Sequence, residues 1–255
     1  MKLNLFRKFL LALFIIALLP LAFSSATLLI NLRNTSSRLA EKISVASDRQ
    51  ASEALQSRAR QIAEDVSRFL SECENDLRLI TALPHDSETM QTFYRNRTLE
   101  LWRRTGTREK PAEERFSAPR YATLELVDKN GRQLFVIHDG KSVTTKQLKD
   151  ISIPANTQFK NETYFAKTAS LKKGEIYVSH VTGFHISKNE QLGTAADSEH
   201  AYGGKEYQGV IRFATPLYRQ DGAFNGAVVL SLDQRHLMEF SQHVLPGSVE
   251  KTVFP

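Results

Sequence analysis

The side chains best suited to chemistry lie between positions 160 and 212 of this 255-residue sequence. They combine aromatic rings with cationic, hydroxyl and imidazole groups. These candidates are Lys160, Tyr164, Phe165, Tyr177, Ser179, His180, Phe184 and Arg212. Arg212 interrupts an otherwise apolar strand, and a cation there must meet an acid, a carbonyl group or an anionic ligand. Glu199 and Glu206 are nearby acids that could pair with it; alternatively, Arg212 reaches solvent from an exposed face.

Enzyme motifs are absent from the sequence. It contains no GxGxxG, no Walker glycine–lysine loop, no HExxH and no GxSxG, so no phosphate cradle, catalytic zinc helix or nucleophile elbow is predicted. The pairs His180/His185 and His236/His243 each lack a third ligand at a diagnostic spacing, which favours ordinary histidines over a metal site. We expect no catalysis, metal or cofactor; an exported hydrolase is the alternative.

The charge distribution argues against a nucleic-acid partner. The formal net charge is +6, but residues 1–33 hold four basic side chains and no acid, and the remaining 222 residues hold 30 basic and 28 acidic ones. A protein that follows a phosphate backbone shows clustered Lys and Arg on a defined segment. Because acids interleave the basic residues throughout the body of this chain, no nucleic acid is expected.

Residues 9–30 form an uncharged, largely apolar segment of 22 residues, which is long enough to cross a hydrocarbon layer of about 30 Å. Lys2, Arg7 and Lys8 precede it, so the positive-inside rule keeps the N-terminus cytoplasmic. A cleavable signal peptide is the alternative, since Ser24–Ala26 resemble a cleavage site. Either interpretation exports the chain after about residue 33, and we expect a single anchor in a bacterial inner membrane with a periplasmic remainder.

A long amphipathic helix is predicted after the anchor. Apolar residues recur every three or four positions between 55 and 80, and a weaker stripe extends back to Leu39, so the helix covers about 39–83. The stripe consists of Leu55, Ala59, Ile62, Val66, Phe69, Cys73, Leu77 and Ile80. Cys73, the only cysteine, is expected to be a small buried hydrophobe on this face. The stripe would serve either a parallel homodimer or packing against a sheet.

The rest of the exported chain predicts an α+β domain with five strands and flanking helices. A second helix should begin at Asp86 or Ser87 and run to about Arg104, followed by a charged connection over 106–119. The strands are expected at 121–127, 133–138, 175–182, 207–218 and 223–232, with a candidate lid loop at 183–206 and a last helix at 234–244. The predicted domains are 1–33, 34–119, 120–244 and 245–255, the last being a further segment or a truncated end.

The order of these features resembles a Cache-type extracytoplasmic sensor domain, which has a PAS-like antiparallel sheet. Tyr164-Phe165-Ala166 leads into residues 175–179, and Ala214-Thr215-Pro216-Leu217 is followed by 226–233 in the same way as in that family. The resemblance implies a small-molecule pocket between the sheet and its loops, and a long helix that dimerises and carries the signal.

The resemblance also implies particular binding positions. Tyr164 and Phe165 match the aromatic pair of the amino-acid-binding branch, whereas Lys160, Thr182 and Ser231 replace its Arg, Tyr and Asp. Loss of an acidic anchor with a cation retained favours an anionic ligand such as a carboxylate. The expected function is therefore the ligand-sensing part of a membrane receptor, a histidine kinase in the first instance. A chemoreceptor, a diguanylate cyclase, a receptor phosphatase and a stand-alone membrane-anchored binding protein are the alternatives.

Overall fold

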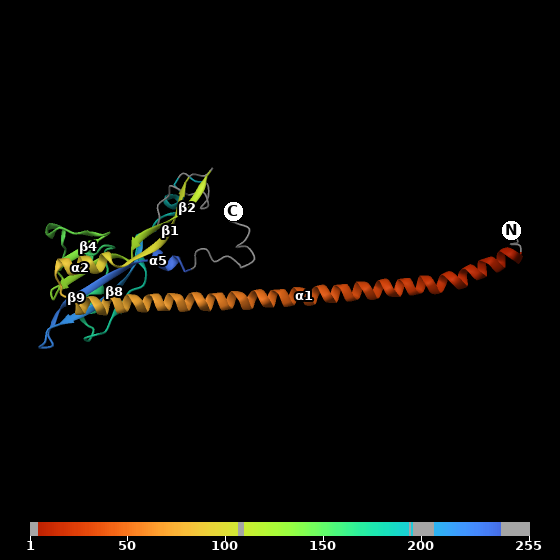
Figure 1. Ribbon diagram of the computed structural model, residues 1–255, viewed down its shortest axis with the longest axis horizontal. Coiled ribbons are helices and arrows are strands. Elements are labelled where there is room, and N and C mark those ends of the chain that lie inside the picture. The colour runs from red at the N-terminus through yellow and green to blue at the C-terminus, as the bar shows by residue number, and fades with distance from the viewer. Residues whose placement is uncertain (1–4, 107–109, 194, 196–206, 241–255) are drawn as a thin grey trace. The chain divides into compact units, whose positions relative to one another are not determined.

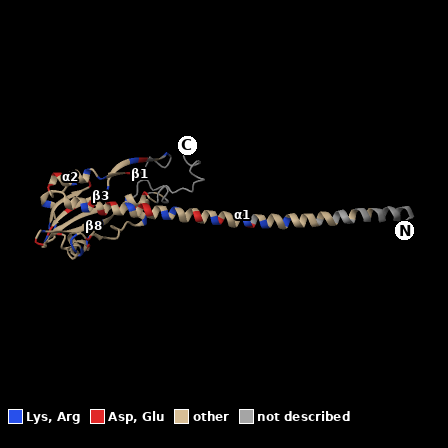
Figure 2. Ribbon diagram, turned by 60° about the horizontal axis from the view of Figure 1, so that its bottom comes forward, with Lys and Arg blue, Asp and Glu red and all other residues tan. Residues whose placement is uncertain are grey.

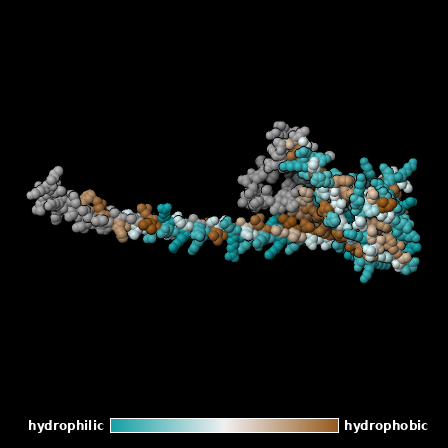
Figure 3. All heavy atoms as spheres, turned by 180° about the vertical axis from the view of Figure 1, so that it is seen from behind, coloured by the Kyte–Doolittle hydropathy of each residue, from teal (hydrophilic) through white to brown (hydrophobic). Residues whose placement is uncertain are grey.

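The computed structural model describes residues 5–106, 110–193, 195 and 207–240, and the chain divides into two units, Met1–Gln61 and Ile62–Pro255. The first unit is part of helix α1, which runs over Leu5–Ala82. Basic and acidic residues interleave along α1, and hydrophobic residues alternate with hydrophilic ones (Figures 2 and 3). Every side chain described in the first unit is exposed, including those of Leu28, Leu39 and Leu55.

Helix α1 ends at Ala82, close to the end predicted at about residue 83. Among the described residues, no helix has the length and the apolar character needed to cross a membrane. Most side chains of the predicted anchor, 9–30, lie outside the described residues.

The second unit is built on an antiparallel sheet in the order β5-β4-β3-β9-β8-β6, with β7 paired to β8. Figure 1 labels strands β4, β8 and β9 of this sheet. Its strands are β3 (Tyr121–Asp128), β4 (Gln133–His138), β5 (Lys141–Ser142), β6 (Tyr177–Val178), β7 (Thr182–Gly183), β8 (Gly209–Tyr218) and β9 (Phe224–Asp233). Both predicted hairpins, β3–β4 and β8–β9, are present. The sheet has seven strands rather than the five expected.

One face of the sheet packs against helices. Phe69, Cys73, Leu77 and Ile80 of α1 are buried with residues of α2 (Ser87–Arg95). The sheet contributes its alternate positions, because successive side chains of a strand point to opposite faces. These positions are Leu124 and Leu126 of β3, Ile211 and Phe213 of β8, and Val228, Leu230 and Leu232 of β9. The apolar stripe of α1 thus packs on its own sheet from Phe69 onward.

Leu77→Ala should destabilise the second unit by about 2–5 kcal/mol, because it removes a fully buried side chain and leaves a cavity under the sheet. Leu79→Ala is the matched control: Leu79 lies on the same turn but is 45% exposed, so its loss should cost about 0.5 kcal/mol or less. Chemical denaturation of both variants measures the difference. Equal losses would show that α1 does not pack on the sheet through Leu77.

A polar cluster joins the last turns of α1 to the start of β3. Asp76 Oδ1 accepts a hydrogen bond from Arg97 Nε at 2.8 Å, and Oδ2 accepts from Arg120 Nη1 at 3.1 Å and from the Tyr121 hydroxyl at 2.8 Å. Arg120 also reaches Glu72, while its buried Nε makes no hydrogen bond with any described residue. Asp76 is therefore the shared acceptor for three donors that come from outside α1.

Cys73 is fully buried beside this cluster, as expected for a small hydrophobe. Burial raises the pKa of its thiol to about 11. A thiol with so high a pKa forms little of the reactive thiolate near neutral pH. The predicted structural role of Cys73 is thus confirmed.

The region after α2 differs from the prediction. Asp86 caps α2 by accepting from Thr89 N at 2.9 Å, but α2 ends at Arg95. Strands β1 (Thr98–Gly106) and β2 (Pro111–Pro119) then form a separate two-stranded antiparallel sheet, where the end of a helix and a connection were expected. The residues 98–102 alternate in a period of two, with Leu101 buried and Trp102 exposed, and this alternation suits a strand rather than a helix.

The prediction of a single strand over 175–182 is also wrong, because two short strands, β6 and β7, lie there instead. Arg212 N donates to Ser179 Oγ, and the Arg212 carbonyl accepts from Ser179 N. The backbone N–H and C=O groups of every second residue of β8 therefore point toward β6, and Pro216 is one of these residues. Since proline has no N–H, the ladder between β6 and β8 ends at the pair Tyr177–Ala214, and the Glu175 carbonyl accepts from Thr215 Oγ1 at 2.8 Å instead.

Short elements complete the second unit. They are η1 (Thr145–Gln147), η2 (Pro154–Asn156), α3 (Tyr164–Ala169), α4 (Lys188–Leu192) and α5 (Arg235–Met238). Helix α4 lies within the predicted lid loop 183–206, most of whose remainder falls outside the described residues, as do residues 241–244 of the predicted last helix and the segment 245–255.

His236 of α5 gives the fold a pH-dependent component. Its ring is buried, and Nε2 donates to the Pro119 carbonyl at 2.9 Å. Burial lowers the pKa of His236 below its ordinary value of 6.5. As the pH falls below about 6.5, the unfolded chain takes up a proton that the folded chain resists, so the free energy of unfolding should fall. Denaturation between pH 7.5 and 5 should show a smaller decline for His236→Gln than for wild type. His138→Gln, at an exposed position, should leave the decline unchanged.

Candidate functional site

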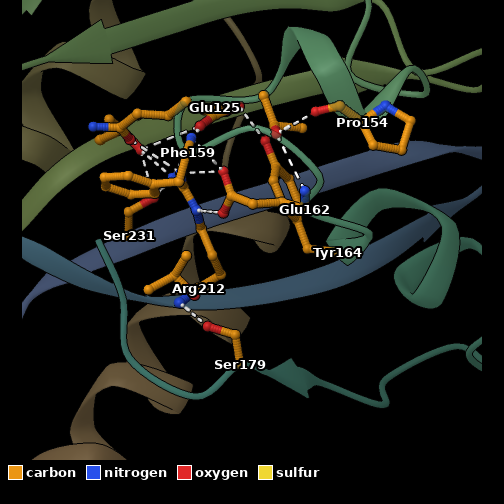
Figure 4. Close-up of polar contacts among 12 residues, drawn as sticks. Glu125, Pro154, Phe159, Glu162, Tyr164, Ser179, Arg212 and Ser231 are labelled. Carbon is orange, nitrogen blue, oxygen red and sulfur yellow. Dashed lines mark hydrogen bonds and ion pairs between the residues drawn. The ribbon is translucent and has the colours of Figure 1, made fainter. Parts of the chain in front are cut away.

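The face of the sheet opposite α1 and α2 carries a buried cation. Arg212 of β8 is 1% exposed, and its side chain points toward groups from two other strands and one loop (Figure 4). Its guanidinium lies over the rings of Phe159 and Tyr164, at 5.6 and 5.1 Å from the ring centres. Cation–π contacts of this kind are strongest when they are shielded from water. Arg212 therefore meets partners inside the protein, and the alternative of an exposed arginine is wrong.

Glu162 makes the closest pairing with Arg212. Its Oε1 accepts from Arg212 Nε at 3.0 Å, and its Oε2 accepts from Nη2 at 3.2 Å. This is a two-point contact between the planar guanidinium and the carboxylate, the strongest form of arginine–carboxylate pair. Gln158 adds its Oε1 at 3.0 Å from Nη2. Both residues belong to the loop 157–163, which connects η2 to α3.

Glu125 of β3 pairs with the other side of the guanidinium. Its Oε1 lies 3.4 Å from Arg212 Nη1, and its Oε2 accepts from Gln133 Nε2 at 2.9 Å and from the Tyr164 hydroxyl at 3.3 Å. Ser231 of β9 also accepts from Arg212 Nη1, and the Ser231 hydroxyl is hydrogen-bonded to that of Thr123. We call Arg212, Glu125, Glu162, Tyr164 and Ser231 the arginine cluster.

The arginine cluster holds one cation and two carboxylates. The side chains of Glu125 and Glu162 are only 5% and 8% exposed. Burial opposes the charge of Arg212, but the neighbouring Glu125 and Glu162 carboxylates outweigh it and raise the arginine's pKa. Burial likewise raises the pKa of Tyr164 well above its ordinary value, with the Glu125 carboxylate adding to the effect. Tyr164 is therefore a neutral hydrogen-bond donor, and Arg212 remains charged.

The structure brings together only part of the predicted site. Tyr164, Arg212 and Ser231 meet in the arginine cluster, and Ser179 joins it through the backbone of Arg212, whose N–H donates to Ser179 Oγ at 2.9 Å. The acids Glu199 and Glu206, considered as partners for Arg212, lie outside the described residues.

The other predicted residues lie apart from the guanidinium. Phe165 is buried in a second apolar cluster with Val127, Ile151, Ala214 and Val229, and Tyr177 packs against it. Lys160 and His180 are exposed, and Thr182 is half-buried in β7. Phe184 is 58% exposed and contacts the Phe159 ring edge-on. No contact of these residues with Arg212 is found.

Two acids of the cluster were missed by sequence reasoning. Glu125 could have been found, because it interrupts the apolar run of 121–127 just as Arg212 interrupts its own strand. The period of two places Thr123, Glu125 and Val127 on one face. Glu162 lies in a loop whose conformation the sequence does not indicate, since Lys160 and Asn161 both adopt positive φ angles, +56° and +58°.

The arginine cluster has the chemistry of a recognition site. Within the described part of the chain, no group of three or more histidine, cysteine, aspartate or glutamate residues is arranged to hold a metal ion. The arginine cluster contains a charged fork, the Tyr164 ring and two hydroxyl groups, and the Phe159 ring lies beside it. Together these groups can bind and orient a planar polar group.

Comparisons with known proteins return sensory domains. No protein-family model matches the sequence, and no curated protein matches it. Solved structures that are similar include the extracellular domain of a histidine kinase, vpHK1S-Z8 (13% identity, TM-score 0.46), a domain of a sensory box/GGDEF family protein from Vibrio parahaemolyticus (17%, 0.28), and the sensory domain of the Campylobacter jejuni chemoreceptor Tlp3, solved with isoleucine bound (14%, 0.41).

The matches cover 75%, 44% and 74% of this chain, which in turn spans 62%, 36% and 61% of the three structures.

Proposed function

We propose that this chain is the extracytoplasmic sensor region of a bacterial transmembrane receptor, binding a small molecule at the arginine cluster and relaying the event through α1. The observation that carries the proposal is that the same strands, β8 and β9, line the arginine cluster on one face and pack against α1 on the other. Arg212 and Ser231 face the arginine cluster, whereas their neighbours Ile211 and Leu230 face α1.

The sheet provides the physical link between binding and output. Because interiors are closely packed, a displacement of β8 or β9 on the cluster side is passed to the side chains that hold α1. A ligand that binds one arrangement of the strands more tightly than another would shift the population of α1 positions. The Asp76 cluster adds a polar attachment between α1 and β3, so α1 follows the sheet through both apolar and charged contacts.

Five classes of membrane protein fit this role. A sensor histidine kinase is the first candidate, followed by a chemoreceptor, a diguanylate cyclase, a receptor phosphatase and a stand-alone membrane-anchored binding protein. The charge pattern around 9–30 supports an N-terminal anchor with the N-terminus in the cytoplasm and the second unit in the periplasm.

A parallel homodimer through the first unit is part of the proposal. Leu39, Ile43 and Leu55 lie on the predicted stripe and are 57%, 60% and 68% exposed, and apolar residues at heptad-like spacing favour pairing of two helices. In a Cys73→Ser background, Leu55→Cys should form a disulfide-linked dimer under mild oxidation, whereas Glu53→Cys, off the stripe, should form much less. Equal crosslinking at both positions would argue against the dimer.

Ligand binding can be tested by thermal unfolding of the full chain, purified in detergent, against carboxylates, amino acids, amines and purines. A ligand at one hundred times its dissociation constant stabilises the folded state by about 2.7 kcal/mol, which raises the midpoint by a few degrees. Tyr164→Phe removes the donor to Glu125 and should weaken the response. Tyr218→Phe removes a hydroxyl that bonds to the Leu171 carbonyl and should not. A cooperative transition that no compound shifts would contradict the proposal.

A further inference from the structure

The contact between Glu162 and Arg212 has the geometry of a bound ligand. Two guanidinium nitrogens meet the two oxygens of one carboxylate at 3.0 and 3.2 Å, as they would meet the carboxylate of a small free acid. The two partners differ in where they are held. Arg212, Glu125 and Ser231 come from the three central strands, whereas Glu162 comes from a loop (Figure 4).

The loop 157–163 is held in an unfavourable backbone conformation. Lys160 and Asn161 are consecutive residues at positive φ, a region that a Cβ atom disfavours. Bonds within the loop and to Arg212 hold this conformation: Asn161 N donates to the Pro154 carbonyl at 2.9 Å, Lys160 N donates to that of Thr157 at 3.3 Å, and Gln158 Oε1 accepts from Arg212 at 3.0 Å. Phe159 N donates to Glu162 Oε2 at 3.0 Å. This last bond depends on the Glu162 carboxylate itself, so release of Glu162 from Arg212 would also loosen this part of the loop.

Charge balance selects the class of molecule that can replace Glu162. With Glu125 held in place by Gln133 and Tyr164, exchange of Glu162 for another monocarboxylate leaves the buried charge unchanged. An amine in the same place would set a second cation against the guanidinium, and a phosphate dianion would add a further buried negative charge. Both are costly where water is excluded.

From these observations we infer that Glu162 is a built-in competitor, and that a small monocarboxylate binds Arg212 by displacing the Glu162 side chain and releasing the loop 157–163. This inference rests on the proposed sensor function and names the ligand chemistry of its site. The exposed Lys160, two residues from Glu162, places a cation on the part of the loop that faces solvent.

Glu162→Ala provides a direct test, because the truncation removes a CH₂–COO⁻ group for which acetate is the free counterpart. The full chain in detergent is unfolded thermally across a sodium acetate series, with sodium chloride at matched ionic strength as the reference. The variant should regain its lost midpoint in a saturable manner. Wild type should respond with at least about tenfold weaker apparent affinity, since its tethered carboxylate competes for Arg212.

Two controls separate a specific effect from a general one. Glu175→Ala removes an exposed carboxylate that accepts from Lys172 N, and it should show no acetate response beyond that of wild type. The double variant Glu162→Ala/Arg212→Lys lacks the two-point fork and should lose most of the acetate response.

A measurement on wild type keeps the test independent of variant folding. Hydrogen exchange of peptides covering 157–163 should accelerate at high acetate, because Phe159 N loses its acceptor when Glu162 leaves. Unchanged exchange at a saturating concentration, or a Glu162→Ala variant that folds without a saturable acetate response, would overturn the inference. If either occurs while another compound still shifts wild type in a Tyr164-dependent manner, the sensor function stands and only the displacement of Glu162 is refuted.

Discussion

Arg212→Ala should lower the free energy of unfolding by about 3–5 kcal/mol, the cost typical of breaking a buried ion pair from one side. The variant would leave the Glu125 and Glu162 carboxylates facing each other in a space that water scarcely reaches. It would also remove the guanidinium that lies over Phe159 and Tyr164. Urea denaturation of the full chain in detergent measures the loss.

The matched control for this variant is Arg219→Ala. Arg219 follows β8, is exposed, and bonds to Asn225 at 3.0 Å, so its removal should cost less than about 1 kcal/mol. Adding Glu125→Gln and Glu162→Gln to an Arg212→Met variant should recover part of the loss, because the uncompensated charges are removed together. If Arg212→Ala and Arg219→Ala cost the same, the arginine cluster does not contribute to stability as described.

Asp76→Ala should destabilise the second unit by about 3 kcal/mol, again through charges left without their partner. Arg97, Arg120 and the Tyr121 hydroxyl would all lose their shared acceptor, and Arg120 would keep only Glu72. Because the lost bonds join α1 to β3, hydrogen exchange in residues 70–82 should accelerate more than exchange in β9. This pattern is measured by mass spectrometry of the exchanged peptides.

Glu74→Ala is the control for Asp76. Glu74 lies on the same helix, its side chain is 42% exposed, and its carboxylate is 3.8 Å from Arg78, so its removal should cost less than about 1 kcal/mol. Asp76→Asn should fall between the two, since it keeps an acceptor oxygen but not the charge. Uniform acceleration of exchange over the whole second unit by Asp76→Ala would show that Asp76 supports the fold without specifically attaching α1.

The elements with a strong repeating pattern were predictable from sequence. The stripe that includes Phe69, Leu77 and Ile80 defined the second part of α1, and the alternating runs on either side of short turns defined the hairpins β3–β4 and β8–β9. The hairpin β1–β2 was missed, because its many charged residues and prolines resemble a connection. The length of β6 depends on whether the backbone of Pro216 points toward β6 or toward β9. The pattern of apolar residues within one strand does not show which neighbouring strand a backbone group points to.

Of the candidate site, Arg212 was predictable from the residues themselves, whereas Tyr164 and Ser231 were chosen from the family pattern. Burial of a cation in an apolar strand required a partner, and that requirement correctly singled out Arg212. The same reasoning could have identified its partner Glu125. It could not have identified Glu162, because the position of Glu162 depends on two non-glycine residues at positive φ, a conformation that the sequence does not indicate. Lys160 was chosen from a family pattern, and the same backbone turn leaves it exposed.

Pro216 also limits how the sheet can grow. Open strand edges present rows of unpaired N–H and C=O groups, onto which other chains can add and aggregate. On the margin of β8 that extends past β6, the donor at position 216 is missing, so an added strand would lack a hydrogen bond there. The segment 171–175 covers this margin instead, because Thr215 Oγ1 donates to the Glu175 carbonyl at 2.8 Å and the Tyr218 hydroxyl donates to the Leu171 carbonyl. The residue that shortens β6 thus closes the sheet on this side with side-chain bonds, which offer another chain no regular row of backbone groups to pair with.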